Sequence, residues 1–442
     1  MQSKYIHYSN LSSRLDPLYY LSDLAIFTDR QITASIGELC SSMYSGFAAG
    51  KETQVKKESG YIQIRPTNIM PDGRLSFEKN VYVPKNRNYT FIPQKAVLFN
   101  NTNSQELVGK TAILDLPNED QYYCSNHITV IIPDQTKLIP EYLWIILNLY
   151  QRRTIFYSIC TNWNNQSGVN VNLLKSVRIP IFSKEANVSL DYQRKIVAIW
   201  LEAFSVERTK EQEAKDLLDS IDDYLLSELG IERPERTENG RFFYTSFKEI
   251  TGGELAPISV QNRGKQSKST QYKEIKLSTI ASITKGQAIT SKEIVDGEYP
   301  VIAGGQSSPY THNQYNHKGD VITVSASGAY SGYVWYHDYP IFASDCSVIF
   351  SKDNNVFLTK YIYEILRLRQ KEIYLLQKGA GQPHVYASDL AQITIPVVSI
   401  EKQMEIILRC NNLRIAADEL TQEGKNLVES AKITIEAMIL GE

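Results

Sequence analysis

Paired cysteines and long apolar runs are both missing from this 442-residue chain. Its five cysteines are widely spread and form no C-x-x-C pair, which argues against a zinc site or a disulfide framework and favours a reducing compartment. No apolar run approaches the roughly 18 residues of a membrane-spanning helix, and no signal peptide opens the chain. We therefore expect a cytoplasmic protein with no membrane partner.

Motifs that carry catalysis are also scarce. The chain has no G-x-S-x-G, H-E-x-x-H or glycine-rich dinucleotide motif. Val108-Gly109-Lys110-Thr111 is similar to the end of a phosphate-binding loop, but Ser104 stands where that motif needs its first glycine. Asp345 and Asp353 lack the neighbouring carboxylates that a nuclease needs to hold a metal ion. We expect no catalytic residue, no metal and no cofactor in this chain.

Glycine and proline are absent from residues 191–229, and Gly230 follows. Apolar residues recur there at heptad spacing, as they do in 399–442, which predicts two long helices that pair as an antiparallel coiled coil. In the second stretch a bulky series alternates with a mainly small one that includes Cys410 and Gly424. Two unrelated surface helices remain the alternative. The predicted pairing residues are Val197, Trp200, Phe204, Leu218, Ile221 and Leu225 in the first helix, and Ile406, Leu413, Leu420 and Leu427 in the second.

The chain also repeats itself. The frame Q-x-x-V-x4-L-x4-I-P begins at Gln166 and again at Gln382, in each case just before a predicted long helix. Gly46 matches Gly286, and residues 124–127 are similar to residues 343–346. Two copies are too few for a solenoid, so we interpret the repeat as a duplicated globular domain.

Short β-prone runs separated by Pro, Gly and Asn turns fill both copies, and one helix comes late in each. We predict an α+β protein in which two mixed, mostly β domains are joined and spaced by the two long helices with pseudo-two-fold symmetry. The predicted segments are a docking segment at 1–30, a first domain at 31–190, a central helix at 191–230, a linker with a basic arm at 231–276, a second domain at 277–398 and a C-terminal helix at 399–442.

Charge is unevenly distributed. Nine acids face three bases between Glu202 and Leu229, and seven face five between Glu401 and Glu436, although the net charge of the chain is only −2. Acidic helices are repelled by nucleic acid, so we interpret them as spacers or protein-binding surfaces. An anionic partner is expected on the globular parts instead.

Polar loops at matching places in the two copies carry the candidate binding residues. Asn and Gln can read adenine edges, Lys can contact guanine or phosphate, and Ser-rich and Gly-rich loops can hold phosphate. A single loop of this composition is more often an ordinary turn, so the prediction depends on the whole set. The candidates are Asn100, Asn101, Asn103, Asn164, Gln166, Lys285, Gln306, Ser325, Ser327, Lys378, Gln382 and His384.

Several stretches resemble the specificity subunits of type I restriction–modification systems. The resemblance is strongest in Y-P-V-I-A-G-G (299–305), V-I-T-V-S-A-S-G-A (321–329), P-I-F-A-S-D-C (340–346) and L-Q-K-G-A-G-Q-P-H-V (376–385). Arg14-Leu15-Asp16-Pro17 is similar to the family's N-terminal motif, from which the second copy departs at Glu254-Leu255-Ala256-Pro257.

The resemblance implies a non-catalytic subunit that reads double-stranded DNA. Each target recognition domain would bind one half of a bipartite target, and the helices would set the gap between the halves. Two methyltransferase subunits, which carry S-adenosylmethionine, would dock on the helical parts, with motor-nuclease subunits as optional partners. Two alternatives stay open: a structural adaptor that presents two protein-binding β domains on a coiled coil, and the reader of a methyltransferase that has no nuclease partner.

Overall fold

The computed structural model describes residues 32–85, 88–116, 121–163, 166–232, 268–379 and 381–440. Its contacts divide the chain into two compact units: unit 1 is Met1–Arg208 with Glu423–Glu442, and unit 2 is Thr209–Gln422. The division falls inside the two long helices, whereas the sequence placed boundaries at their ends. The predicted docking segment and residues 233–267 of the predicted linker lie outside the described residues.

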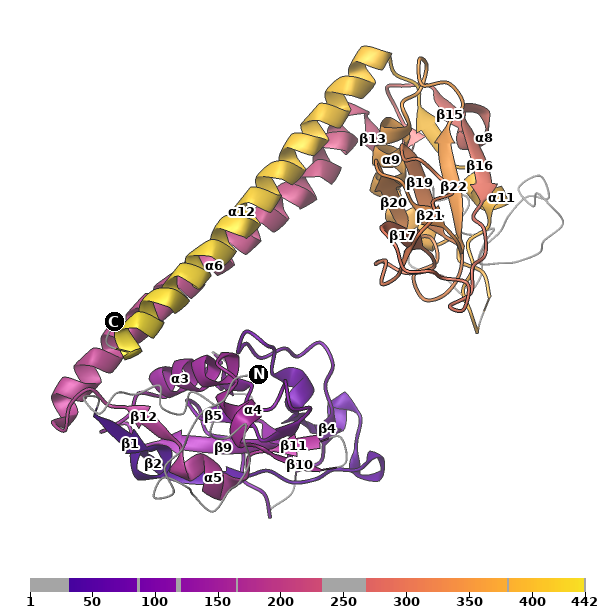
Figure 1. Cartoon of the computed structure of the whole chain (residues 1–442). Coiled ribbons are helices and arrows are strands. Elements are labelled where there is room, and N and C mark those ends of the chain that lie inside the picture. Colours follow the sequence, from indigo (N-terminus) through magenta and orange to yellow (C-terminus); the bar gives the residue numbers. More distant parts are fainter. Residues whose placement is uncertain are drawn as a thin grey trace. The chain divides into compact units, whose positions relative to one another are not determined.

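Unit 1 is built on a four-stranded antiparallel sheet in the order β2-β9-β5-β7 and a three-stranded sheet in the order β4-β3-β8 (Figure 1). A short antiparallel pair joins β1 to β12, and a further small sheet has the order β10-β11-β6. The strands are β1 Thr33–Ser35, β2 Cys40–Ser45, β3 Tyr61–Ile64, β4 Tyr82–Val83, β5 Val97–Asn100, β6 Thr102–Asn103, β7 Thr111–Ile113, β8 Tyr123–Cys124, β9 Ile128–Pro133, β10 Thr161–Trp163, β11 Gln166–Gly168 and β12 Arg178–Pro180. The helices are α2 Ile36–Leu39, α3 Pro140–Arg152, α4 Ile155–Ile159 and α5 Val171–Ser176.

Unit 2 repeats the two larger sheets and the short strand pair of unit 1, and it has a further pair, β13-β14. Its four-stranded sheet has the order β16-β22-β19-β20, its three-stranded sheet β18-β17-β21, and its short pair joins β15 to β23. The strands are β13 Ile231–Glu232, β14 Lys268–Ser269, β15 Glu274–Lys276, β16 Ala281–Lys285, β17 Tyr299–Ile302, β18 Thr311–His312, β19 Val321–Ser325, β20 Val334–His337, β21 Phe342–Ala343, β22 Cys346–Ser351 and β23 Thr394–Pro396. The helices are α8 Leu277–Ile280, α9 Thr359–Leu368, α10 Gln370–Tyr374 and α11 Ala387–Leu390. The duplicated domain predicted from the sequence is confirmed.

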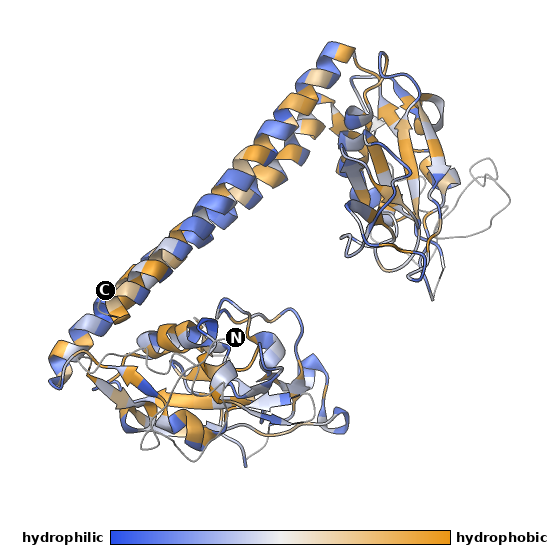
Figure 2. Cartoon of the chain, viewed as in Figure 1, coloured by the Kyte–Doolittle hydropathy of each residue, from blue (hydrophilic) through white to orange (hydrophobic). Residues whose placement is uncertain are grey.

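Alternation along the central strands explains the layers of each unit. Successive side chains of a strand point to opposite faces. In unit 2, Ile322 and Val324 therefore pack with α9 in one apolar cluster, whereas Val321 packs with β17 and β21 in another. Unit 1 divides in the same way between a cluster that holds α3 and one that holds β3 and β8. The central strands are accordingly buried on both faces and strongly hydrophobic, as Figure 2 shows.

The predicted antiparallel pairing of two long helices is confirmed in each unit. α6 runs over Ala186–Glu228 and α12 over Ile400–Leu440. In unit 1 the beginning of α6 shares an apolar cluster with the end of α12, through Trp200 and Ile435. In unit 2 the end of α6 meets the beginning of α12, through Leu225 and Ile406. An ion pair between Glu228 and Lys402 also joins the two helices in unit 2.

In the middle of α12, small residues lie deeper in the helix pair than the predicted bulky series does, although Ile406 near its start is buried. Among the predicted pairing residues, Val197, Trp200, Ile221, Leu225 and Ile406 are buried, and Phe204, Leu413 and Leu420 are half-buried. Leu218 and Leu427, however, are 46% and 43% exposed, so placing them on the contact face was wrong. The buried positions of α12 include Cys410, Ala417, Gly424, Val428 and Ala431.

Close approach of the two backbones explains this difference. A Cβ added to Gly424 would lie 3.3 Å from the Cα of Glu207, so the helices meet nearly backbone to backbone there. A straight α-helix also drifts by about 20° per heptad relative to an exact seven-residue repeat. The contact stripe therefore passes through Val428 beside Leu427, and through half-buried Leu217 beside Leu218.

Identical hydrogen bonds hold equivalent places of the two units. In unit 1 the buried Gln193 side chain accepts from Ile139 N–H at 2.8 Å, and in unit 2 Gln403 accepts from Leu358 N–H at 2.8 Å. The hydroxyl of Tyr142 donates to Pro180 O at 2.9 Å, and that of Tyr361 donates to Pro396 O at 2.9 Å. In each unit the first bond joins the long helix to the start of α3 or α9, and the second joins α3 or α9 to the strand β12 or β23, so both units share one framework.

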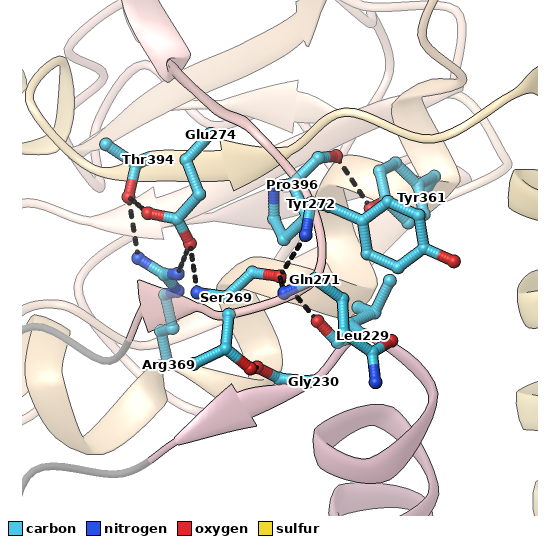
Figure 3. Close-up of polar contacts among 11 residues, drawn as sticks. Leu229, Gly230, Ser269, Gln271, Tyr272, Glu274, Tyr361, Arg369, Thr394 and Pro396 are labelled. Atoms are coloured by element: carbon cyan, nitrogen blue, oxygen red, sulfur yellow. Dashed lines mark hydrogen bonds and ion pairs between the residues drawn. The ribbon is translucent and has the colours of Figure 1, made fainter.

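A polar network holds the end of α6 in unit 2 (Figure 3). The Ser269 hydroxyl donates to Leu229 O at 2.6 Å, and Ser269 N–H donates to Glu274 Oε1 at 3.1 Å. The same carboxylate accepts from Arg369 Nη2 at 2.8 Å and from the Thr394 hydroxyl at 2.6 Å. Arg369 is only 1% exposed. The carbonyl group of Leu229, which directly follows the last residue of α6, is thereby tied through Ser269 and Glu274 to the β15–β23 pair.

Candidate nucleic-acid interface

Four segments of unit 2 gather at one end of its central sheet. β19 ends at Ser325, which pairs with Cys346 at the start of β22, and β16 ends at Lys285, which pairs with Ser347. The parallel strands β17 and β21 finish together at Ile302 and Ala343. Residues 285–290, 303–308, 326–331 and 344–345 therefore all leave or enter the sheets at this end.

A fifth segment, residues 378–379 and 381–386, packs onto the same end. Gly328 N–H donates to Pro383 O at 3.1 Å, and Val385 N–H donates to Ala326 O at 3.1 Å. Lys378 and His384 exchange two backbone hydrogen bonds of 2.9 and 2.8 Å, which close the segment into a hairpin. Backbone hydrogen bonds thus define the positions of these segments. We call residues 285–290, 303–308, 326–331, 344–345, 378–379 and 381–386 the unit 2 loop face.

The structure brings most unit 2 candidates together on this face. Lys285, Gln306 and Gln382 are exposed, whereas Ser327 and His384 are half-buried. Lys378 forms an ion pair of 2.9 Å with Asp389, and its ammonium lies 5.4 Å from the ring centre of Tyr386, so its charge is already engaged.

Ser325 is buried, so the prediction that it contacts a partner was wrong. It is the last residue of β19, which is buried at every position of the strand.

Sequence reasoning missed three exposed side chains of the unit 2 loop face. Tyr330 and Tyr386 are about half exposed, and aromatic rings with a polar tip suit recognition surfaces. Asp345 is exposed as well, and one of its carboxylate oxygens, Oδ2, accepts a hydrogen bond from the Ser327 hydroxyl. The matched segments 124–127 and 343–346 were the available signal, because they place Asp345 beside the loops that follow β17 and β19.

Unit 1 has a corresponding loop face. β5 ends at Asn100 opposite Ile128, and β2 ends at Ser45 opposite Thr129. Val169 N–H donates to Asn101 O at 2.9 Å, as Val385 does to Ala326 in unit 2. A hollow of about 390 Å³ lies at this end; residues that line it include Asn101, Thr102, Asn126, Trp163 and Gly168.

The unit 1 candidates divide between surface and interior. Gln166 is exposed and Asn103 is half-buried, whereas Asn164 lies outside the described residues. Asn101 is nearly buried, and its amide donates to Thr129 Oγ1 at 3.0 Å and to Asn126 O at 3.2 Å. Asn100 is completely buried, and its amide donates to Leu107 O at 3.3 Å. Both amides therefore hold the chain at the strand end. The assignment of the completely buried Asn100 as a surface contact was wrong, whereas Asn101 lines the hollow and its contact with DNA stays a prediction.

The ionisable groups near these faces have structural surroundings. Burial raises the pKa of the Cys124 and Cys346 thiols to about 12, so both stay protonated. Lys110 donates to Pro66 O at 3.2 Å and to Ile69 O at 2.7 Å, and burial lowers its pKa. Lys110 is therefore not placed to hold a phosphate, in agreement with the rejected P-loop.

The described ranges contain neither a metal-binding cluster nor a membrane-spanning helix. No group of three or more His, Cys, Asp or Glu side chains there is arranged to hold a metal ion. Within the same ranges, no helix combines the length and apolarity needed to cross a membrane.

Comparison with known proteins identifies the family. The model of the type I restriction modification DNA specificity domain matches residues 33–217 and again residues 269–430. These two ranges cover most of the chain and coincide with the two copies of the framework. The chain belongs to this specificity family.

Individual relatives agree. Over 85 residues, or 19% of this chain and 20% of the relative, it is 33% identical to a putative type I restriction enzyme MjaX specificity subunit of Methanocaldococcus jannaschii. Over 377 residues it is 21% identical to the putative type I specificity subunit S.MpnORF638P of Mycoplasma pneumoniae, covering 85% of this chain and 89% of that one. A chain solved in work on "complex assembly and conformational transition of the type I R-M system" is 13% identical, with a TM-score of 0.54 over 93% of this chain and 97% of that one. This last likeness shows the shared fold.

The specificity subunit is a DNA-recognition protein and not a catalytic one. The sequence-based prediction of the family and of two mixed domains with paired helices is confirmed by the family match and the fold. Which side chains touch DNA was predicted from loop composition and stays a prediction, apart from the buried residues corrected above.

Proposed function

We propose that each unit of this specificity subunit reads one half of a bipartite double-stranded DNA target through its loop face. One observation carries the proposal: the two units present equivalent loop faces on the same framework, but with different side chains. In unit 1 the exposed residues include Gln166 and Trp163, and in unit 2 they include Lys285, Gln306 and Gln382. A duplicated scaffold with divergent loops suits two different half-targets joined in one chain.

The chemistry of the two faces supports readout of bases. Amide side chains can bond bidentately to adenine, and hydroxyls and backbone N–H groups can hold phosphates, which fix register without reading sequence. Lys285 would add a phosphate contact that weakens as salt rises. The acidic long helices would be repelled by the DNA backbone, so we place the DNA on the loop faces.

We propose further that the paired helices set the gap between the half-targets. α6 has 43 residues and α12 has 41, so each is roughly 60 Å long at about 1.5 Å per residue. A contact seam of small residues favours one register, because a one-turn slip would place larger side chains against Glu207 where Gly424 now lies.

The helices also offer surface for protein partners. In unit 2, α12 exposes Met404, Leu408 and Ile415, which share one helical face at spacings of four and seven residues. Apolar stripes on an exposed helix are typical of protein–protein contact. We propose that two methyltransferase subunits, which carry S-adenosylmethionine, dock on the helical parts, and that motor-nuclease subunits can join the assembly in the cytoplasm.

The deciding experiment is methylation of a random DNA library by this chain with its cognate methyltransferase, followed by single-molecule sequencing. We expect a two-part motif with a fixed unspecified gap. A continuous motif would still indicate a protein that reads DNA, but it would contradict the proposal that each unit reads one half of a bipartite target. An absence of methylation, together with no salt-sensitive DNA binding by the purified complex, would favour the adaptor that presents two protein-binding domains.

Matched insertions test the gap. Counting from the contact between Glu207 and Gly424, antiparallel pairing places Ala214 opposite Ala417. Seven residues added after Glu213 and seven added after Ala417 preserve both heptad stripes and lengthen the pair by about 10 Å, or about three base pairs. We expect the sequenced gap to grow by that amount with both half-motifs unchanged.

The single insertion after Glu213 is the control. It shifts α6 against α12 and should abolish assembly, as judged by gel filtration with the methyltransferase. A change of base preference after the matched insertion would contradict a pure spacer role for the helices.

A further inference from the structure

The unit 2 loop face contains an exposed carboxylate. Asp345 stands between β21 and β22, and its Oδ2 accepts a hydrogen bond from Ser327. It is the only acidic residue in the five segments of the face, which also contain Lys285 and Lys378. An acid in this position is unexpected on a surface that faces phosphates, because it opposes the general attraction between protein and DNA.

Backbone contacts fix the carboxylate in place. Ala326 N–H donates to Asp345 O at 3.2 Å, which links the loop after β19 to the loop after β21. A Cβ added to Gly304 would lie 2.7 Å from Ser327 O and 3.6 Å from Asp345 Oδ2. Three segments therefore meet near this side chain, and glycine at 304 leaves room for the Ser327 carbonyl group beside it. A carboxylate offers about four acceptor positions, so the bond from Ser327 leaves capacity for another donor.

The edges of the bases in the major groove decide what such a group can accept from. Guanine presents only acceptors, O6 and N7, and thymine presents the acceptor O4. Adenine presents the N6 amino donor beside the acceptor N7, whereas cytosine presents the N4 amino donor. Cytosine is therefore the base that best offsets the unfavourable charge of a carboxylate.

We propose that Asp345 is a specificity-determining residue that accepts a hydrogen bond from cytosine N4 in the half-target read by unit 2. This rests on the proposed function, because it requires that the unit 2 loop face contacts DNA. Ser327 is a positioning residue that orients the carboxylate. The negative charge also lowers affinity for every sequence without an amino group at that position, so Asp345 contributes to selectivity through repulsion as well as attraction.

Unit 1 places a different chemistry at the equivalent point. There Asn101 N–H donates to His127 O at 3.0 Å, in the position where Ala326 N–H meets Asp345 O in unit 2. Two residues, Asn126 and His127, stand there between the equivalents of Ser344 and Cys346, and both side chains can donate as well as accept. The two half-targets should therefore differ at the base pair that faces this position.

The test compares sequenced methylation motifs for the complete complex of the wild-type chain, Asp345→Asn and Asp345→Glu. The half read by unit 2 is identified as the one that changes when Gln306 and Gln382 are replaced by alanine. Asp345→Asn should lower the preference for cytosine at one position of that half by roughly 5- to 150-fold, because an amide is not restricted to accepting. It should also raise binding to a random duplex. Asp345→Glu should keep cytosine and lower the methylation rate.

The matched control is Asp338→Asn, which removes the same charge at the other end of the sheet from the loop face. Asp338 follows His337, the last residue of β20, which pairs with the first residue of β19. This variant should leave the motif unchanged.

A wild-type unit 2 half-target without cytosine, or an unchanged motif in Asp345→Asn, would overturn the assignment while leaving DNA recognition intact. If Asp345→Asn fails to assemble, the Asp345→Glu variant provides the test. A change of the preferred base from cytosine to another base in that variant would contradict the proposal. No motif from the wild-type complex would instead remove the proposed function itself.

Discussion

Replacing Gly286 with alanine should abolish recognition of one half-target and leave the other intact. A Cβ at this position would lie 2.1 Å from Ser344 O and 2.9 Å from Ala343 O. Both atoms belong to backbone, so relief requires residues 343–346 to move, and Asp345 moves with them. We expect a loss of about 3 kcal/mol in the stability of unit 2. The measurement is denaturant unfolding of the chain, combined with methylation of duplexes that carry only one correct half-target.

The duplicated framework supplies a matched experiment in unit 1. A Cβ at Gly46 would lie 2.1 Å from Cys124 O, so Gly46→Ala should impair the other half-target by the same mechanism. Gly381→Ala is the control for stability, because no atom lies within 4 Å of an added Cβ there. If Gly286→Ala and Gly381→Ala unfold at the same denaturant concentration, the close approach at Gly286 is not the constraint that we infer.

Removal of the buried guanidinium is expected to destabilise unit 2 still more. Arg369→Met takes away the 2.8 Å ion pair with Glu274 and leaves that carboxylate, 13% exposed, with only uncharged donors. Breaking a buried ion pair from one side typically costs about 3–5 kcal/mol. Since Glu274 also accepts from Ser269, which holds Leu229 O, the end of α6 should loosen as well. Hydrogen exchange of residues 225–230 and denaturant unfolding measure the two effects.

At the equivalent position, unit 1 has an uncharged side chain. Tyr142 and Tyr361 make equivalent hydrogen bonds, and eight residues after each stand Tyr150 and Arg369. The Tyr150 hydroxyl donates to Arg178 O at 2.8 Å. Tyr150→Phe should therefore cost only about 1 kcal/mol. A loss in Arg369→Met no larger than that of Tyr150→Phe would show that the ion pair contributes little.

The helices and the repeat were predictable because both leave periodic traces in the sequence. Heptad spacing predicted α6 and α12, and the recurrence of Gln166 and Gln382 with their neighbours predicted two copies. Which of the heptad positions lie on the contact face between the two helices was less predictable. Leu218 and Leu427 are the larger residues, but the backbones approach where Gly424 is small, and the contact stripe follows that approach.

The sequence predicted where the candidate site lies, but not which residues form it. Residue type pointed to the correct loops, but Asn100 and Ser325 are strand-end residues whose burial depends on which way the strand presents them. From the sequence, Asp345 was considered only as a metal ligand, because basic and amide side chains are the ones expected on a surface that faces DNA. Its role emerges only when the Ser327 and Gly304 contacts place it among five converging segments.

The bonds that build the shared framework run from matching side chains of the two units to backbone atoms, as Gln193 and Gln403 show. A backbone C=O is present whatever side chain its residue carries, and a backbone N–H is present in every residue except proline. Substitutions of exposed loop-face side chains, unlike those of closely packed glycines such as Gly286, therefore leave this framework in place, and new target preferences can accumulate without loss of folding. The architecture is in this sense evolvable: selection can act on one recognition half at a time, while the other half keeps its inherited target.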